Sequence, residues 1–136
     1  MQIEIQITSQ RIAGNVSPPL ADAGALAEFS GLVRGEEDGR TIAALEYEAY
    51  SPMAERVMRE IIAELGERHP CLFVRVTHRI DVVPVGEAAI HIVTAARHRA
   101  EAFAMLTEFM HRLKQDVPIW KRRALTGDEL DALKKS

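Results

Sequence analysis

Residues 72–114 read LFVRVTHRIDVVPVGEAAIHIVTAARHRAEAFAMLTEFMHRLK, and this stretch decides the fold. Residues 72–79 and 88–96 are rich in apolar and β-branched residues, which predicts two strands. A turn around Pro84 and Gly86 is expected to join them. The two strands therefore form an adjacent pair in the chain.

A helix is predicted directly after the second strand. From about His98 to Lys114 the apolar residues recur at helical spacing, and Pro118 ends any helix before it. Because these apolar residues share one face, the helix is amphipathic and packs against the rest of the fold. The side chains predicted to face inward are Phe103, Leu106, Phe109, Met110 and Leu113.

The preceding part of the chain has the same order of two strands and a helix. Residues 24–34 alternate with a period of two, and residues 41–50 are rich in strand formers, so we expect the two runs to pair as a hairpin. The acidic, glycine-bounded run 35–39 between them is predicted to be a mobile, solvated turn.

The helix that follows this pair has clear start and stop signals. Ser51 is predicted to be its N-cap, with Pro52 at the first helical position, and Gly66 and Pro70 bracket its end. Its predicted apolar stripe consists of Met53, Val57, Met58, Ile61, Ile62 and Leu65.

The ends of the chain add shorter elements. Residues 3–7 alternate as a half-buried strand, residues 17–19 form a loop, and residues 20–22 form one short helical turn. Residues 119–124 are short and extended, and residues 126–129 match a capping box that opens a terminal helix. Strand pairs that are each followed by a helix favour an α+β fold, with a mixed or antiparallel sheet and two main amphipathic helices. We expect residues 1–136 to form a single domain.

The composition excludes several classes of protein. The chain has 136 residues, 47% of them apolar, with 17 basic and 20 acidic residues and a net charge of −3. No overall positive field attracts nucleic acid or an acidic membrane surface, and no apolar run is long enough to span a membrane. The N-terminus lacks the features of a signal peptide, and the single cysteine is typical of a reducing compartment, so we expect a cytoplasmic protein.

Common catalytic and metal-binding motifs are missing from the sequence. There is no dinucleotide or P-loop fingerprint, and the 5 histidines never occur at H-x-H or H-E-x-x-H spacing, so no metal site is predicted. The acidic run 36–38 lacks the alternating ligands of a calcium loop. Cys71 opens an apolar strand, so we expect a buried structural thiol and not a nucleophile.

Three separated basic groups stand out in this acidic chain. Residues 111–123 carry five basic residues and one acidic residue, a net of 5 − 1 = +4. Residues 97–99 (Arg-His-Arg) lie at the start of a predicted helix, whose free N–H groups favour an anion, and Arg34 ends a predicted strand. Together they indicate a local phosphate or carboxylate site. Each group taken alone also fits a solvated helix or strand end, and that alternative stays open.

Longer strings of residues carry a resemblance to one family. The chain resembles the large, catalytic subunit of molybdopterin synthase from about residue 24 to residue 121. The matching strings are FSGLVR (29–34), LEYEAY (45–50), MA (53–54), HR (78–79), VGE (85–87), RHR (97–99), AF (102–103) and LKQDVPIWK (113–121).

This resemblance implies an α/β-hammerhead type of fold and a homodimer. It also implies a small ubiquitin-like sulfur carrier as partner, whose C-terminal Gly-Gly thiocarboxylate enters a pocket of the large subunit. Sulfur is transferred to cyclic pyranopterin monophosphate, which becomes the dithiolene of molybdopterin, and no metal or other cofactor is implied. The given sequence ends in Lys-Lys-Ser without a Gly-Gly, so we do not expect it to be the carrier.

The resemblance assigns the catalytic role to two lysines. Lys114 is implied to meet the thiocarboxylate and to stabilise negative charge, and Lys121 is implied to act beside it on the pterin. The implied substrate-binding residues are Arg34, His98, Arg99, Arg122, Arg123 and Phe29. Core packing explains Phe29 equally well.

The chain departs from the family pattern at two places. Many relatives have a Glu where this chain has Arg123, and the tail beyond that position is short. A non-catalytic paralogue that binds a pterin or a partner is therefore kept as the alternative. A generic ligand-binding module would show no dependence on a Gly-Gly carrier.

Overall fold

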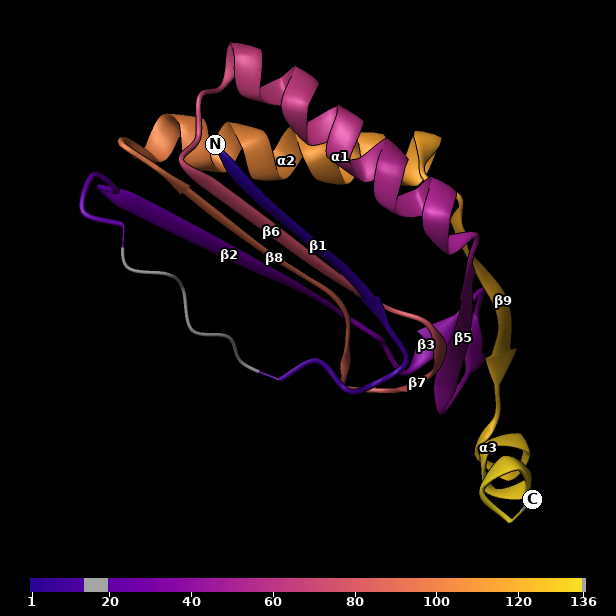
Figure 1. Cartoon of the computed structure of the whole chain (residues 1–136). Coiled ribbons are helices and arrows are strands. Elements are labelled where there is room, and N and C mark those ends of the chain that lie inside the picture. Colours follow the sequence, from indigo (N-terminus) through magenta and orange to yellow (C-terminus); the bar gives the residue numbers. More distant parts are fainter. Residues whose placement is uncertain (14–19, 136) are drawn as a thin grey trace.

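The computed structural model describes residues 1–13 and 20–135, and the loop predicted at 17–19 lies outside them. A four-stranded sheet is covered on one face by the two long helices α1 and α2, a smaller three-stranded sheet stands at one end, and α3 lies beyond it (Figure 1). The α+β class with a mixed sheet is thus confirmed. No helix among the described residues is long and apolar enough to cross a bilayer.

The described chain contains nine strands and three helices. The strands are β1 (Gln2–Thr8), β2 (Ala25–Leu32), β3 (Glu36–Glu37), β4 (Arg40–Thr41), β5 (Ala44–Ala49), β6 (Phe73–Arg79), β7 (Asp81–Pro84), β8 (Ala88–Ala96) and β9 (Ile119–Leu125). The helices are α1 (Ser51–Arg68), α2 (Arg99–Asp116) and α3 (Gly127–Lys134).

The large sheet has the strand order β1-β6-β8-β2. β1 runs parallel to β6, whereas β6 and β2 both run antiparallel to the central β8. β6 and β8 therefore pair as the sequence predicts. All of β8 beyond Ala88 is buried, because strands flank it on both sides and helices cover one face.

The core between this sheet and the helices confirms most of the predicted apolar stripes. Met58, Ile61, Ile62 and Leu65 of α1 and Phe109 and Leu113 of α2 are buried together with Val74, Val76 and Ile92 of the sheet. Two predicted core residues are wrong: Met53 is 40% exposed and Phe103 is 60% exposed. Ala54 and Met105 occupy the core instead, because each lies on the side of its helix that faces the sheet.

The predicted hairpin between residues 24–34 and 41–50 is wrong. β2 pairs along its whole length with β8, and β5 lies in the small sheet between β7 and β9. Between β2 and β5 the short β3–β4 hairpin redirects the chain, and its turn residues Asp38 and Gly39 both have positive φ (51° and 76°). A two-residue turn with positive φ at both positions matches the right-handed twist of the strands that flank it. The local β3–β4 hairpin therefore forms here, and β5 pairs in the other sheet.

The chain also changes sheets directly after β6, a feature that the sequence analysis missed. Asp81 has a φ of 65°, a left-handed conformation that turns the chain away from the large sheet. β7 then pairs with β5 before the turn at Val85 and Gly86 leads into β8. The predicted connection between β6 and β8 is therefore a strand plus a turn.

Smaller elements follow the sequence with local differences. The N-cap of α1 is Tyr50 and not Ser51, which occupies the first helical position. Residues 20–22 form a turn closed by a hydrogen bond from the Ala23 N–H to the Leu20 carbonyl (3.2 Å), not a helix. The capping box of Thr126 and Glu129 is present and begins α3, as predicted.

Candidate functional site

A cavity of about 430 Å³ lies where the two sheets meet the C-terminal end of α2. Its lining includes Phe29 of β2, Tyr47 of β5 and His78 of β6. Lys114 of α2 and Lys121 of β9 line the same cavity. With Ala89 and Ile90 of β8, six elements far apart in the sequence thus supply one hollow, with two cations at its rim and aromatic rings in its wall.

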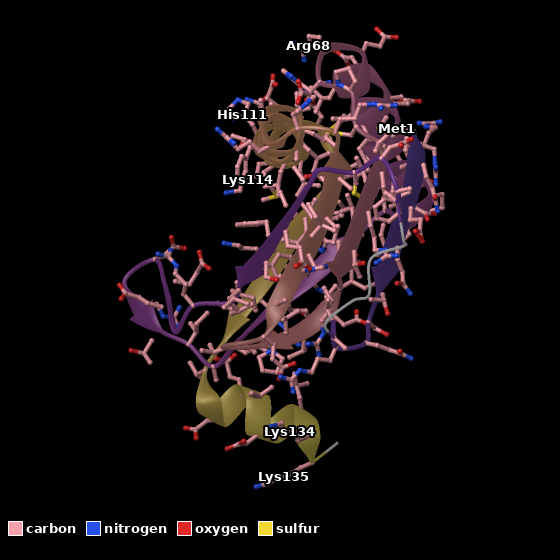
Figure 2. The ribbon with its side chains drawn as sticks, turned by 90° about the vertical axis from the view of Figure 1, so that its left-hand side faces the viewer. Met1, Arg68, His111, Lys114, Lys134 and Lys135 are labelled. Atoms are coloured by element: carbon pink, nitrogen blue, oxygen red, sulfur yellow. The ribbon has the colours of Figure 1, made fainter. Side chains whose placement is uncertain are left out.

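Lys114 occupies the last turn of α2, where its charge complements the partial negative charge of the helix end. The side chain is exposed and forms no ion pair with any residue in the described ranges. Figure 2 shows Lys114 and His111 near one another on α2, whereas Lys134, the last residue of α3, and Lys135 after it lie at the far end of the molecule. Lys114 is therefore a cation that is available to an incoming anion.

Lys121 is held in a different way. Its Nζ donates to both carboxylate oxygens of Glu37 at 3.2 Å, from the tip of the β3–β4 hairpin. Its neighbour across the β5–β9 ladder is Tyr47. Burial, and next the charge of Glu37, raise the pKa of the Tyr47 hydroxyl, so this side chain stays neutral at physiological pH.

His78 forms the inner wall of the cavity and is 6% exposed. Its ring meets the Tyr47 ring edge-on, with centroids 5.4 Å apart. Its Nδ1 lies 2.8 Å from the Arg79 carbonyl oxygen. Burial lowers the pKa of the imidazole, and the contact with the Arg79 carbonyl opposes this shift without reversing it.

Arg122 and Arg123 do not line the cavity with the lysines. The register shifts between Glu46 and Tyr47, so that β9 has one extra residue there, as in a β-bulge. Both arginines consequently reach the same carboxylate oxygen of Glu46, at 3.8 Å from Arg122 Nε and 2.8 Å from Arg123 Nε. Their predicted place next to a substrate stays a prediction.

His98 and Arg99 lie at the opposite end of α2 from Lys114. At a rise of 1.5 Å per residue, the axial separation of Arg99 and Lys114 is about 22 Å. His98 lines a separate hollow of about 240 Å³ that it shares with Cys71 and Glu101. Within one chain these residues and the lysines do not form one site.

Arg34 is also separate from the lysines. It lines a hollow of about 560 Å³ beside the β3–β4 hairpin, together with Glu36 and Asp38. Of the predicted site residues, the structure brings together only Phe29, Lys114 and Lys121.

Cys71 is buried, as predicted, and burial followed by the charge of Glu101 raises the pKa of its thiol to about 11. A thiol with such a pKa is almost entirely protonated at neutral pH and is a poor nucleophile. Among the described residues, no three His, Cys, Asp or Glu side chains gather as a metal site would require.

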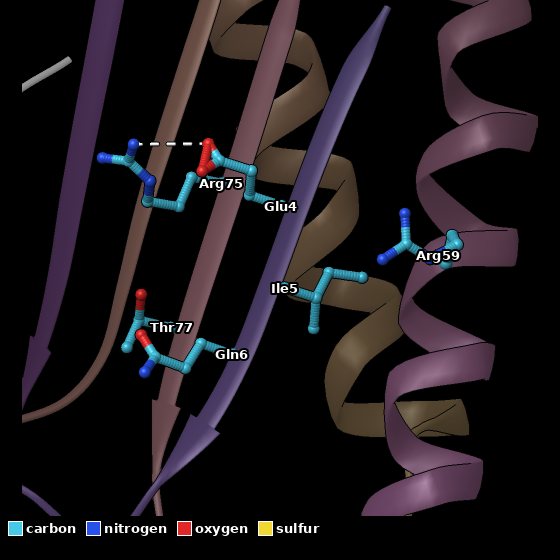
Figure 3. A pocket seen from close by; sticks show the side chains of 6 residues that line it. All are labelled: Glu4, Ile5, Gln6, Arg59, Arg75 and Thr77. Atoms are coloured by element: carbon cyan, nitrogen blue, oxygen red, sulfur yellow. Dashed lines mark hydrogen bonds and ion pairs between the residues drawn. The ribbon is translucent and has the colours of Figure 1, made fainter. Parts of the chain in front are cut away.

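Another hollow follows the free edge of β1 (Figure 3). Its charged side chains have partners within the protein: Arg75 donates to Glu4 at 3.3 Å, and Arg59 donates to the Ile3 carbonyl at 3.5 Å. Because Arg75 is already paired with Glu4 and Arg59 already has a backbone partner, this hollow is a weaker candidate than the lysine cavity.

Sequence reasoning missed three residues of the site. His78 and Tyr47 stand in the strings HR and LEYEAY, but nothing in their spacing shows that they meet. Glu37 was predicted only as part of a solvated turn. The signal that could have found it is the Asp38-Gly39 dipeptide, which favours a tight hairpin and so a defined position for the residue before it.

The model of the family described as MoaE protein matches residues 3–116. The chain belongs to the MoaE protein family. It is 42% identical over 101 residues to the molybdopterin synthase catalytic subunit of Bacillus subtilis, and the match covers 74% of this chain. The chain spans 64% of the length of that relative.

Solved structures agree with this membership of the MoaE family. Molybdopterin synthase from Staphylococcus aureus superimposes with a TM-score of 0.80 at 30% identity, over 90% of this chain and 91% of that one. A protein–protein complex of subunits 1 and 2 of molybdopterin-converting factor from Helicobacter pylori 26695 has a chain with the same fold, with a TM-score of 0.65 at 18% identity over 93% of this chain and 90% of that one.

Proposed function

We propose that this MoaE-family chain is the catalytic subunit of a molybdopterin synthase. It would transfer sulfur from the C-terminal thiocarboxylate of a small ubiquitin-like carrier to cyclic pyranopterin monophosphate, forming the dithiolene of molybdopterin. The observation that carries the proposal is the convergence of Lys114 and Lys121 on one cavity. The activity named for the Bacillus relative supports it.

Lys114 is proposed to receive the thiocarboxylate. It is exposed at the rim of the cavity. No carboxylate among the described residues pairs with it, so an incoming anion does not have to displace one to reach the ammonium. After the thiocarboxylate sulfur has bonded to the substrate, water attacks the acyl carbon, the bond between that carbon and sulfur breaks, and the carrier leaves as a carboxylate. Negative charge develops on the acyl oxygen during this attack. A nearby ammonium stabilises that charge more than it stabilises the ground state.

Lys121 of β9 is proposed to act on the pterin in the same cavity. Its ammonium is shared with Glu37, so it is anchored by an ion pair before any substrate arrives. Phe29 and Tyr47 line the same cavity as the two lysines and supply ring surface that suits a planar heterocycle.

The partners follow from the same geometry. A cavity open at the rim accepts an extended tail, and subunits 1 and 2 of the Helicobacter protein with this fold form a complex. A molecule on Lys114 cannot touch His98 or Arg99 of the same chain about 22 Å away. If these residues bind the substrate, they come from a second copy, so we propose a homodimer with a carrier on each subunit. A cytoplasmic location is proposed because the single cysteine is a free thiol.

Reconstitution tests this function. The purified chain is mixed with thiocarboxylated carrier and cyclic pyranopterin monophosphate, and molybdopterin is measured. Lys114→Ala and Lys121→Ala are each expected to lower the rate about 100-fold, as for removal of a key electrostatic group. Lys134→Ala, a lysine on α3 at the other end of the molecule, is the matched control and should keep the full rate (Figure 2). Absence of product from the unmodified chain with bound carrier would instead identify a non-catalytic paralogue.

A further inference from the structure

His78 is the deepest polar side chain of the lysine cavity, and the function proposed above gives it no role. It lies at the end of β6, is 6% exposed and packs against the Tyr47 ring. A buried histidine is often satisfied at both ring nitrogens. Here only one nitrogen has a hydrogen-bond partner within the described part of the chain.

The hydrogen bond at Nδ1 fixes which nitrogen carries the proton. The partner is the Arg79 carbonyl oxygen at 2.8 Å, and a carbonyl oxygen can only accept. Nδ1 must therefore donate. In the neutral ring the other nitrogen, Nε2, then carries a lone pair and is an acceptor.

Nε2 forms no hydrogen bond with any residue of the described chain. Burial also keeps the ring neutral, because it lowers the pKa of the imidazole. The inner wall of the cavity thus presents an acceptor that lacks a donor. In the described part of the chain, the fully buried side-chain atoms without a partner are Arg79 Nε and Glu101 Oε2. Nε2 of His78 is not one of them, so it is open to the cavity, where a ligand N–H can donate to it.

The other side chains of the cavity show what kind of ligand this is. The ammonium groups of Lys114 and Lys121 and the indole of Trp120 can only donate. The acceptors in the wall are His78 Nε2 and the Tyr47 hydroxyl. A matching ligand therefore has an anionic group toward the lysines and an N–H donor on its ring toward the inner wall.

We propose that His78 Nε2 accepts a hydrogen bond from a ring or exocyclic N–H of the pterin and so orients the heterocycle between the two lysines. This inference rests on the proposed function, since it names the group of that substrate that the cavity recognises by a hydrogen bond. It makes His78 a binding residue with a defined tautomer. An aromatic anion of similar size without N–H donors would gain nothing from His78.

Binding of two fluorescent probes tests the proposal. The first is pterin-6-carboxylate, which has N–H donors and an anionic group, and the second is 2-naphthoate, which has only the anionic group. His78→Phe is expected to weaken pterin-6-carboxylate by about 10-fold, the effect of one lost hydrogen bond to a buried acceptor, and to change 2-naphthoate by less than about 2-fold. His78→Gln, whose side-chain oxygen reaches the same region, should recover part of the loss.

Tyr47→Phe is the matched variant, because it keeps the ring against His78 and removes only the other acceptor of the wall. A loss for pterin-6-carboxylate in Tyr47→Phe but not in His78→Phe would overturn the proposal, as would equal losses for both probes in His78→Phe. Failure of pterin-6-carboxylate to bind the unmodified chain would overturn it too.

Thermal unfolding of each variant shows whether it is folded. If His78→Phe does not fold, an unchanged affinity of His78→Asn, whose shorter side chain cannot reach the heterocycle, would overturn the proposal.

The test is separate from that of the proposed function. If the unmodified chain makes molybdopterin but the affinity for pterin-6-carboxylate does not change in the His78 variants, only the role of His78 fails. If the chain makes no molybdopterin while pterin-6-carboxylate binds in a His78-dependent manner, the catalytic function fails and the recognition of the heterocycle stands.

Discussion

Lys121 Nζ lies 3.2 Å from both carboxylate oxygens of Glu37, whereas Lys114 in the same cavity has no ion pair within the described part of the chain. The two cations therefore differ before any substrate binds. An anion that approaches Lys121 must compete with Glu37, and one that approaches Lys114 meets no such competitor. The β3–β4 hairpin thus sets the charge of one half of the cavity.

Glu37→Gln is expected to strengthen the binding of anions to the cavity. Removing the carboxylate releases Lys121, so the affinity for pterin-6-carboxylate should rise about 2- to 5-fold, the scale of a partly exposed ion pair. Titration by fluorescence measures it. Glu36→Gln is the control, because Glu36 is exposed on the same hairpin and does not contact Lys121. Equal affinities in the two variants would contradict the prediction.

Phe109 and Phe103 provide a matched pair for the core of α2. Phe109 is fully buried against the large sheet, and Phe103 is 60% exposed on the same helix. Phe109→Ala is expected to lower the free energy of unfolding by about 3–5 kcal/mol, because it leaves a cavity. Phe103→Ala should change it by less than about 0.5 kcal/mol. Denaturant unfolding measures both, and similar losses would show that α2 packs differently.

Cys71 should play no part in sulfur transfer. With a thiol pKa of about 11, the thiolate is about one part in a thousand at pH 8, so alkylation of the folded protein should be slow and should accelerate in denaturant. Cys71→Ala should keep the rate of molybdopterin formation within about 3-fold, because a buried thiol of high pKa carries no sulfur to the substrate. Mass spectrometry and the reconstituted assay check the two statements. A persulfide on Cys71 during turnover would refute them.

Local patterns predicted the elements that depend on neighbouring residues. The apolar and alternating runs indicated β1, β6 and β8, the helical spacing indicated α2, and the Thr126–Glu129 box indicated the start of α3. Each of these patterns involves only residues that are close in the sequence, within one helix or one strand. The extent of a single domain over residues 1–136 stays a prediction.

The choice of strand partners could not be predicted in the same way. β2 and β5 look like a hairpin because they are adjacent in sequence. Instead, the left-handed Asp81 turns the chain from β6 into β7, which pairs with β5 on one side, and β9 pairs with β5 on the other. Tyr47 meets His78 and Lys121 only through this second sheet. Such contacts depend on topology, which no local period shows.

The separation of the basic groups follows from the sequence alone. A helix from about His98 to Lys114 already places these two residues at opposite ends, more than about 20 Å apart at about 1.5 Å for each residue. The basic groups of the sequence could therefore not all line one cavity of one chain. The strings that carry the family resemblance include Lys114 and Lys121, the two lysines that line one cavity.

The neutral imidazole of His78 gives the stability of the protein a specific dependence on pH. Its pKa is lowered in the folded state, so below the ordinary value of 6.5 the unfolded chain binds more protons at this residue. The stability that this group contributes is therefore fully present above pH 6.5 and falls as the pH decreases.

One such group changes the free energy of unfolding by at most about 1.4 kcal/mol per pH unit. Urea unfolding between about pH 8 and pH 5 should show a steeper loss for the unmodified chain than for His78→Gln. Parallel curves would mean that His78 is protonated equally in the folded and unfolded states, and so that burial does not lower its pKa.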